Sequence, residues 1–255
     1  MVELKTRAEL EVMREAGRVV GTALAACRDA AAVGVSLLEL DDVAAGVLSD
    51  FGATSSFQHY HPHFAPTPFP RVMITSVNDV IVHGIPSAYR LRDGDLLSID
   101  FGASLGGFHG DAAVSFVVGE ADPADVALVE TTEKALHAGI AAARVGGRLG
   151  DISHAVGEIG RAAGYGIPED FGGHGVGRRM HEDPSVPNEG KPGRGLRLRE
   201  GLVLAIEPMF MAGGQDKYTI DDDGWSLRTV DGSRAAHFEH TVAITADGPV
   251  ILTVP

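Results

Sequence analysis

Polar residues with the spacing of helix caps precede the first two stretches in which apolar residues recur at helical intervals. Thr6 and Glu9 have the spacing of a capping box, in which the two side chains satisfy backbone amides at the start of a helix. The alanine-rich run that follows ends near Gly34, and Ser36 and Glu39 repeat the spacing. The pattern predicts two consecutive helices at the start of the chain.

The rest of the chain alternates between strand-like and helix-like patterns. The second helix is predicted over residues 37–50 with its end at Gly52, and a loop rich in proline and histidine follows. Helices return between Pro123 and Gly164. Strand patterns are found at residues 71–76, 96–101, 110–118, 202–207 and 236–252.

Two segments of the chain are similar to each other. VGVSLLELDDVAAGVLSDFG from Val33 and VGGRLGDISHAVGEIGRAAG from Val145 align without gaps, and their glycine and apolar positions coincide. Chance similarity between two amphipathic helices accounts for part of this match. The other interpretation is a chain of two halves related by pseudo-symmetry.

Composition and charge narrow the class of protein. With 255 residues, 44% of them apolar, the chain can bury a full core as a single domain over residues 1–255. The formal charge of −14 argues against broad binding to nucleic acids or anionic membranes and favours cationic partners such as protein N-termini. Cys27 is the single cysteine, and neither a signal segment nor a membrane span is evident, so a reducing cytoplasm fits.

Two aspartates flank the predicted turn of a hairpin. The segments SID and GDAAVSFVV alternate like strands, and the residues between them, which include three glycines, have the composition of a loop. If the turn centres between Leu105 and Gly106, Asp100 and Asp111 face each other directly. Facing residues on an antiparallel pair have Cβ atoms about 4.5 to 5.5 Å apart. Two carboxylates so placed repel each other unless a cation lies between them.

Three further residues complete a candidate set of metal ligands. Glu207 lies in the apolar run LVLAIEPMF and Glu239 precedes the strand-like HTVAIT, and a buried acid needs a partner or a metal ion. His174 lies among glycines in GGHGVG. Taken singly, each also fits an ordinary surface or packing role. With the two aspartates they form an oxygen-rich set that suits Mn, Fe, Co or Zn ions with open coordination positions.

Several longer motifs occur in an order that points to a family. From the N-terminal side they are SVNDVIVHGIP, GDLLSIDFGASLGGFHGDAAVSF, GGHGVGRRMHEDPSVPN, GLVLAIEPM and FEHTVAIT. From about Glu9 to Thr253 the chain resembles a type I methionine aminopeptidase. The resemblance implies the α+β pita-bread fold, with pseudo-twofold halves and a curved antiparallel sheet covered by helices. It also implies a metal-dependent hydrolase that removes the initiator methionine from new proteins and peptides.

The resemblance assigns a role to each metal ligand. Two divalent ions (Co, Mn, Fe or Zn) would share carboxylates, and a hydroxide bridging them would attack the first peptide carbonyl. Asp100 and Asp111 would hold one ion, His174 and Glu207 would complete the other, which Asp111 also reaches, and Glu239 would bridge both. Glu207 would also pass the proton of the water to the leaving amine.

Two histidines outside the metal set match substrate-side histidines of the family. His83 lies in VHGIP and His181 in MHEDP. An imidazole in such a place can donate a hydrogen bond to the carbonyl or to the developing oxyanion. His181 is assigned to the carbonyl oxygen and His83 to the side of the scissile nitrogen; the alternative is that each caps a turn.

Substrate choice depends on a region where the chain departs from the family. The segment SSFQHYHPHFAPTPFP, residues 55–70, is longer and richer in histidine than the usual loop. Phe69, Met180 and Trp225 are the apolar candidates for holding a methionine side chain. The three alternating histidines of the loop are expected to be solvated or packed on aromatic residues rather than to bind a metal ion.

Two other functions use the same fold. An Xaa-Pro aminopeptidase or prolidase would share the ligands and histidines, but it usually carries a separate N-terminal domain, for which the roughly seventy residues before SVND are too few. A catalytically silent peptide-binding relative would typically lose ligands, whereas all are present. As a methionine aminopeptidase, the chain is expected to be a cytoplasmic monomer that acts on the N-termini of nascent proteins and peptides, a role compatible with ribosome association.

Overall fold

Helices and strands occupy most of the chain. A computed structural model describes residues 2–63 and 65–255. Its helices are α1 (Arg7–Ala30), α2 (Leu37–Phe51), α3 (Pro123–Ala142) and α4 (Leu149–Ala162). Its strands are β1 (Thr54–Ser55), β2 (Ile74–Val77), β3 (Val80–Val82), β4 (Asp95–Leu105), β5 (Phe108–Val118), β6 (Gly172–Gly175), β7 (Glu182–Pro187), β8 (Val203–Ile206), β9 (Met209–Met211), β10 (Tyr218–Ile220), β11 (Leu227–Thr229), β12 (Ala235–His237), β13 (Glu239–Thr245) and β14 (Gly248–Ile251).

The first two helices begin at the predicted caps. The Glu9 amide donates to the Thr6 hydroxyl, and the Glu9 carboxylate accepts from the Thr6 amide at 2.8 Å. The capping box of α2 is formed in the same way, and α2 ends at the left-handed Gly52. Helix α1 ends at Ala30 rather than near Gly34, because the Gly34 amide donates to the Leu91 carbonyl outside the helix.

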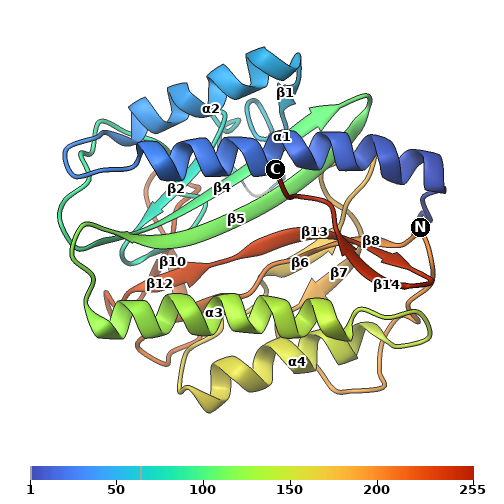
Figure 1. The fold of residues 1–255 in the computed structure, drawn as a ribbon. Helices are drawn as coiled ribbons and strands as arrows, with labels where there is room; N and C mark the ends of the chain where they lie inside the picture. Colours follow the sequence, from blue (N-terminus) through green and yellow to red (C-terminus); the bar gives the residue numbers. More distant parts are fainter. Residues whose placement is uncertain (1, 64) are drawn as a thin grey trace.

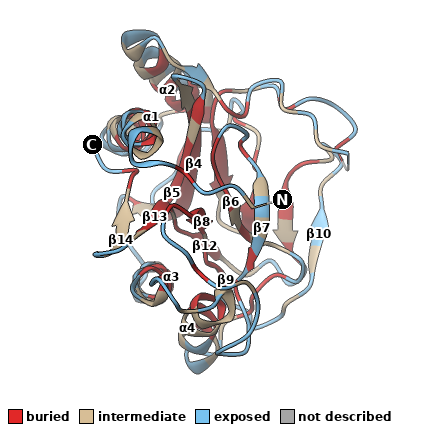
Figure 2. Ribbon diagram, turned by 90° about the vertical axis from the view of Figure 1, so that its right-hand side faces the viewer, coloured by how far each residue is buried: buried red, intermediate tan, exposed pale blue. Residues whose placement is uncertain are grey.

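A large antiparallel sheet forms the centre of the molecule. Within the described residues it has nine strands in the order β1-β4-β5-β13-β8-β6-β7, with β14 beside β13 and β2 beside β4. Smaller sheets are formed by β10-β11-β3 and by β12-β9. In Figure 1, α1 and α2 lie above the long strands β4 and β5, while α3 and α4 lie below β13 and β8. Figure 2 shows that the helices leave the side of the sheet toward β7 and β10 uncovered.

Each half of the sheet has a hydrophobic core of its own. Val20, Leu40 and Ile99 belong to the cluster between α1, α2 and the β4–β5 hairpin. Leu136 and Leu204 belong to the cluster between α3, α4 and the strands β8 and β13. Figure 2 shows this burial as red strands between the helices. The arrangement agrees with the two similar segments in the sequence, which form α2 and α4 and the turns before them.

The hairpin of β4 and β5 differs from its prediction by one residue at the turn. Gly106 and Gly107 have φ angles of 61° and 80° and form a two-residue loop, a conformation that glycine adopts without strain. Gly102 and Leu105, predicted as loop, therefore belong to β4. Moving the turn centre by one residue moves every pairing by two.

As a consequence, the prediction that Asp100 and Asp111 face each other directly is wrong. Asp100 pairs with Ala113 and Asp111 with Gly102. Because side chains alternate along a strand, a shift of two keeps both carboxylates on the same face of the sheet. The two aspartates are diagonal neighbours rather than directly opposite ones. Diagonal neighbours are still close enough for their side chains to interact.

Two other strand predictions change because of contacts distant in the sequence. The Asp41 carboxylate of α2 accepts from the amides of Val72 and Met73, both at 3.0 Å, so that strand β2 begins at Ile74. The segment 236–252, for which strand was predicted, is divided among three strands, and the Phe238 amide donates to the Pro208 carbonyl oxygen between β12 and β13. No helix in the described ranges is long and apolar enough to cross a membrane.

Candidate metal centre and substrate cavity

The five predicted ligands lie on the strands at the middle of the large sheet. Asp100 is on β4, Asp111 on β5 and His174 on β6, while Glu207 follows β8 and Glu239 begins β13. All five line one cavity of about 630 Å³. Five segments spread over 140 positions of the sequence thus meet at one place.

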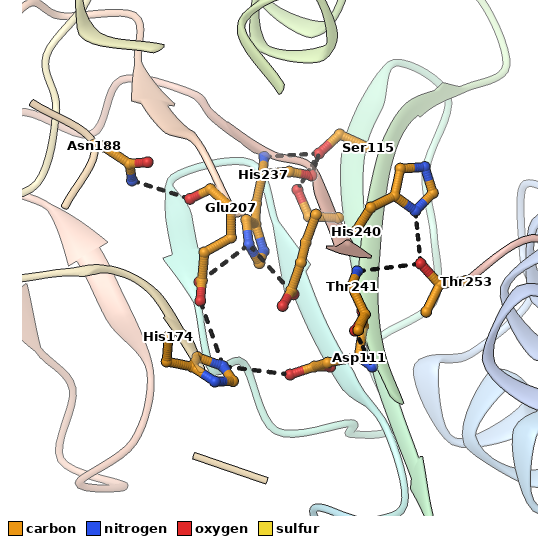
Figure 3. A network of polar contacts seen from close by, with 11 residues as sticks. Asp111, Ser115, His174, Asn188, Glu207, His237, His240, Thr241 and Thr253 are labelled. Atoms are coloured by element: carbon orange, nitrogen blue, oxygen red, sulfur yellow. Dashed lines mark hydrogen bonds and ion pairs between the residues drawn. The ribbon is translucent and has the colours of Figure 1, made fainter. Parts of the chain in front are cut away.

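The imidazole of His174 lies between two carboxylates. Its Nε2 is 3.7 Å from Asp111 Oδ2 and 3.7 Å from Glu207 Oε1, as the dashed lines in Figure 3 show. These distances are longer than hydrogen bonds. Its Nδ1 lies 2.9 Å from the Gly175 carbonyl oxygen, which can only accept, so Nδ1 carries a proton. That hydrogen bond leaves the Nε2 lone pair directed at the cavity, as in metal-binding histidines.

Three carboxylates of the cluster each have one buried oxygen without a hydrogen-bond donor within residues 2–63 and 65–255. Among the described residues, Asp100 Oδ1, Asp111 Oδ1 and Glu239 Oε1 have no hydrogen-bond partner. Burial raises the pKa of Asp100 and of Glu239 well above the usual range, and the neighbouring carboxylates add to the rise. Buried acids without donors need a cation. The donor set and its unpartnered oxygens therefore fit divalent metal ions.

A residue that the sequence analysis did not single out reaches the same cluster. His237, the last residue of β12, is 2% exposed, and its Nε2 is 3.6 Å from Glu207 Oε2 and 4.0 Å from Glu239 Oε2. In the described part of the chain, the groups with metal-binding spacing are Asp111, His174 and Glu239, and Glu207, His237 and Glu239. The available signal was the position of His237 two residues before Glu239, which directs both side chains to one side of an extended chain.

His181 lines the cavity beside the metal ligands. Its ring centre is 4.3 Å from that of His174, and its other face stacks on Tyr60 at 5.1 Å and 28°. Burial lowers the pKa of His181 to about 3, with a smaller contribution from nearby histidines. The ring is therefore neutral near pH 7 and carries one N–H to donate.

His83 also lines the same cavity. It has a left-handed φ of 62°, and the next residue packs so tightly on β2 that a Cβ at Gly84 would lie 2.1 Å from the Thr75 carbonyl oxygen. Burial lowers the pKa of His83 to about 4, and its Nδ1 has no hydrogen-bond partner within the described ranges. The ring packs edge-on against Phe171 and Trp225. An unpartnered, neutral imidazole remains available to a ligand.

The apolar candidates gather beside the cluster, with one difference among them. Phe69 and Trp225 line the cavity and meet edge to face, with ring centres 5.1 Å apart. Met180 belongs to the same hydrophobic cluster, but it packs behind the wall, next to Gly102, and does not line the cavity. Phe57 and Ile74 do line it and were missed, because only the fold brings them to the wall.

The loop over residues 55–70 supplies part of this wall. Across the loop, the Phe69 amide donates to the Tyr60 carbonyl oxygen, and the His59 amide donates to the Phe69 carbonyl oxygen. His59, His61 and His63 are exposed and do not join a metal-binding group among the described residues. Residue 64 lies outside those residues.

Comparison with known proteins finds relatives that match nearly the whole chain. The family model for metallopeptidase family M24 matches residues 11–246. Methionine aminopeptidase 1 of Mycobacterium tuberculosis is 52% identical, over 100% of this chain and 96% of the relative. Methionine aminopeptidase of Clostridium acetobutylicum is 44% identical over 100% and 99% of the two chains.

Solved structures agree. The methionine aminopeptidase structure from Thermotoga maritima superposes with a TM-score of 0.95, at 39% identity and with 100% of both chains covered. A prolidase from Pyrococcus furiosus has a TM-score of 0.77 at 24% identity. The superposition covers 99% of this chain but 65% of the prolidase, and a likeness at this identity concerns the fold alone.

Proposed function

The chain belongs to metallopeptidase family M24 and has the pita-bread fold, and we propose that it is a methionine aminopeptidase that hydrolyses the bond after the N-terminal methionine of proteins and peptides. The observation that carries the proposal is the meeting of two features in one cavity: a cluster of acidic and histidine ligands, and an aromatic wall beside it. The first suits hydrolysis of a peptide bond and the second suits an apolar side chain.

The proposed ligands of the ions are the five predicted residues, Asp100, Asp111, His174, Glu207 and Glu239. Their unpartnered buried oxygens support this assignment, and their number supports two ions rather than one. Bound divalent ions would supply the activation of the attacking water and the polarisation of the carbonyl. Co, Mn, Fe and Zn are the ions that this donor set suits.

The two neutral histidines are proposed to hold the peptide bond. His181, next to His174, is placed to donate its N–H to the carbonyl oxygen, whose negative charge grows during the reaction. His83, which lines the same cavity, would contact the scissile nitrogen. Because neither ring is charged near pH 7, each can donate a hydrogen bond without adding positive charge beside the ions.

Glu207 is the proposed carrier of the proton. Its side chain is 13% exposed, and its two oxygens face His174 and His237 at 3.7 and 3.6 Å. A carboxylate at this position can accept a proton from the attacking water and give it to the leaving amine. The acidic cluster also suits the positive α-amine of the substrate, which favours removal of a single terminal residue.

The aromatic wall is the proposed binding site of the methionine side chain. Phe57, Phe69, Ile74 and Trp225 enclose it, and burying a side chain of this size contributes about 1.5 to 3 kcal/mol. Met180 would act from behind the wall by fixing its shape. We propose that residues 1–255 act as one catalytic domain, as a monomer in the cytoplasm on newly made or ribosome-bound N-termini.

The test is release of the first residue from Met-Ala-Ser and Ala-Pro-Ala, measured by mass spectrometry with chelator-stripped protein and added Mn, Co, Fe or Zn. Metal-dependent loss of methionine from the first peptide, with the second left intact, is the expected result. Preferred cleavage before proline would assign the chain to the Xaa-Pro branch. Cleavage of neither peptide with any ion would overturn the proposal in favour of a binding protein.

A further inference from the structure

The backbone of His237 is held firmly beside the metal centre. Its amide donates to Ser115 Oγ at 2.9 Å, and Ser115 Oγ donates to its carbonyl oxygen at 2.7 Å, as Figure 3 shows. Ser98 Oγ lies 2.7 Å from Ser115 Oγ and completes a buried serine pair. His237 also pairs with Met209 across β12 and β9. These contacts fix the position from which the imidazole extends.

The imidazole extends toward the carboxylates and finds no hydrogen bond there. In the part of the chain that the structure describes, Nε2 has no hydrogen-bond partner, although buried ring nitrogens nearly always have one. It is 3.6 Å from Glu207 Oε2 and 4.0 Å from Glu239 Oε2. Figure 3 shows the ring directed toward Glu207. An unpartnered nitrogen in this place calls for a ligand.

The spacing around His237 matches the spacing around His174. His174 Nε2 is 3.7 Å from each of its two carboxylate oxygens, and the values for His237 are 3.6 and 4.0 Å. Two ligand atoms about 2.0 to 2.2 Å from one ion lie roughly 3 to 3.6 Å apart in tetrahedral or octahedral geometry. Glu207 lies between the two rings, with Oε1 facing His174 and Oε2 facing His237.

We propose that His237 is an additional metal ligand, which binds an ion through Nε2 together with Glu207 and Glu239. The proposal rests on the proposed function, because it concerns the same metal centre. The centre then presents an imidazole on each side of its carboxylates. Imidazole suits Zn and Fe, whereas carboxylate suits Mn and Mg, so His237 shifts the preference of the centre toward the nitrogen-binding ions, including Co.

A spectroscopic count of imidazoles tests the assignment directly. In Co²⁺-loaded protein, each coordinated histidine gives a ring N–H proton signal that the paramagnetic ion shifts far outside the ordinary NMR range. The wild type should show two such signals, and His237→Gln should lose one of them. His174→Asn should keep the signal that His237→Gln loses. A wild-type spectrum with a single shifted imidazole, or an unchanged pair in His237→Gln, would overturn the proposal.

Metal affinity supplies the second readout, measured by calorimetric titration with Co²⁺ and with Mn²⁺. Loss of a partner outside the coordination sphere lowers metal affinity by about 10- to 100-fold. His237→Gln is expected to weaken one Co²⁺ site by more than about 100-fold, and to weaken Mn²⁺ binding less. Equal losses for the two ions, or a Co²⁺ loss below about 100-fold, would assign the ring to orienting Glu207 instead.

The matched control is His240→Gln. His240 is three residues further along, but its Nδ1 bonds to Thr253 Oγ1 at 2.8 Å on the far side of β13, as Figure 3 shows. Both shifted signals and both affinities should remain as in the wild type. The number of coordinated imidazoles can be read from the wild-type spectrum alone. The proposal can therefore be tested even if His237→Gln folds poorly. A wild type that binds ions and releases methionine with one shifted imidazole would refute this inference alone, whereas absence of binding and release would refute the proposed function.

Discussion

A buried ion pair fastens the start of the chain to the wall of the cavity. Lys5 Nζ lies 2.8 Å from Glu182 Oε2, and the two side chains are 1% and 8% exposed. Glu182 directly follows His181, and it also accepts from the Arg179 amide at 3.1 Å. Replacing Lys5 by Met keeps an unbranched apolar chain in place and removes the charge. Glu182 then remains buried with only the backbone amides of Arg178 and Arg179 as donors.

The expected loss of stability follows from that burial. Breaking a buried pair by removing one partner costs about 3 to 5 kcal/mol, because the remaining charge is uncompensated. For a chain of this size, a loss of 3 kcal/mol lowers Tm by about 6 to 12 °C. The control is Arg18→Met, which breaks the Arg18–Glu15 pair of 2.7 Å, whose side chains are 51% and 52% exposed. Exposed pairs contribute at most about 1 kcal/mol.

The effect should depend on pH in a defined direction. Burial raises the pKa of Glu182, but the hydrogen bond and charge of Lys5, together with the backbone amides of Arg179 and Arg178, outweigh it, so the pKa in the folded state is lowered. A carboxyl with a lowered pKa stabilises the fold above its unfolded pKa, and this contribution disappears as the pH falls through the folded pKa. The difference between wild type and Lys5→Met should therefore be full at pH 7 and shrink in acid.

Urea denaturation of the wild type, the two single variants Lys5→Met and Glu182→Gln, and the double variant provides the measurement. The double variant should be more stable than the sum of the single losses predicts, because it leaves no unpaired charge. Additive losses, or a Lys5→Met loss no larger than that of Arg18→Met, would refute the reasoning from burial.

Three predictions concern the reaction itself. Glu207→Gln should keep the fold and lower kcat by about 10²- to 10⁴-fold, since the amide cannot carry the proton; near-normal turnover would refute the assignment. His83→Ala should lower kcat while the metal content stays at the wild-type value, and loss of metal would instead make His83 part of the metal centre. Asp100→Ala should reduce the metal content measured by elemental analysis, and unchanged content would contradict its role as a ligand.

The parts of this structure that sequence predicts well depend on local rules. The capping boxes at Thr6 and Ser36 were readable because all their atoms lie within four residues. The convergence of the five ligands came from the resemblance to a family, and the fold implied by that resemblance is confirmed by the solved relatives. The helix starts and the ligand residues could therefore be predicted without knowing the contacts between distant segments.

The parts that sequence did not predict depend on contacts between distant segments. Strand β2 starts late because Asp41 captures the amides of Val72 and Met73 from another element. His237 faces the acids only because Ser115 on β5 holds its backbone. The register of the β4–β5 hairpin was also missed, because the turn centres between Gly106 and Gly107 rather than one residue earlier. None of these three features can be predicted from the amino-acid composition of the segments concerned.

The proposed metal centre lies where the two halves of the molecule join. Strands β5 and β13 pair across this joint through Glu239 with Ala113 and His240 with Ala112, and Thr241 Oγ1 exchanges hydrogen bonds with the Asp111 backbone. The ligands on β4 and β5 belong to one half, and those on β6, β8 and β13 to the other. Ions bound between them would therefore link two separately packed cores, and each ion at a free concentration of 100 times its dissociation constant would add about 2.7 kcal/mol of stability.

Removing the ions with a chelator should consequently loosen the joint before it loosens either core, because the acids of the two halves then repel one another. Hydrogen exchange followed by mass spectrometry should show faster exchange in one peptide that contains Asp111 and in another that contains Glu239, since their strands meet at the joint. The cores around Leu40 and Leu136 should show little change, since they lie within single halves. An equal increase in exchange rate in all four peptides would mean that the ions stabilise the whole chain as one unit. The joint would then not open independently of the two cores.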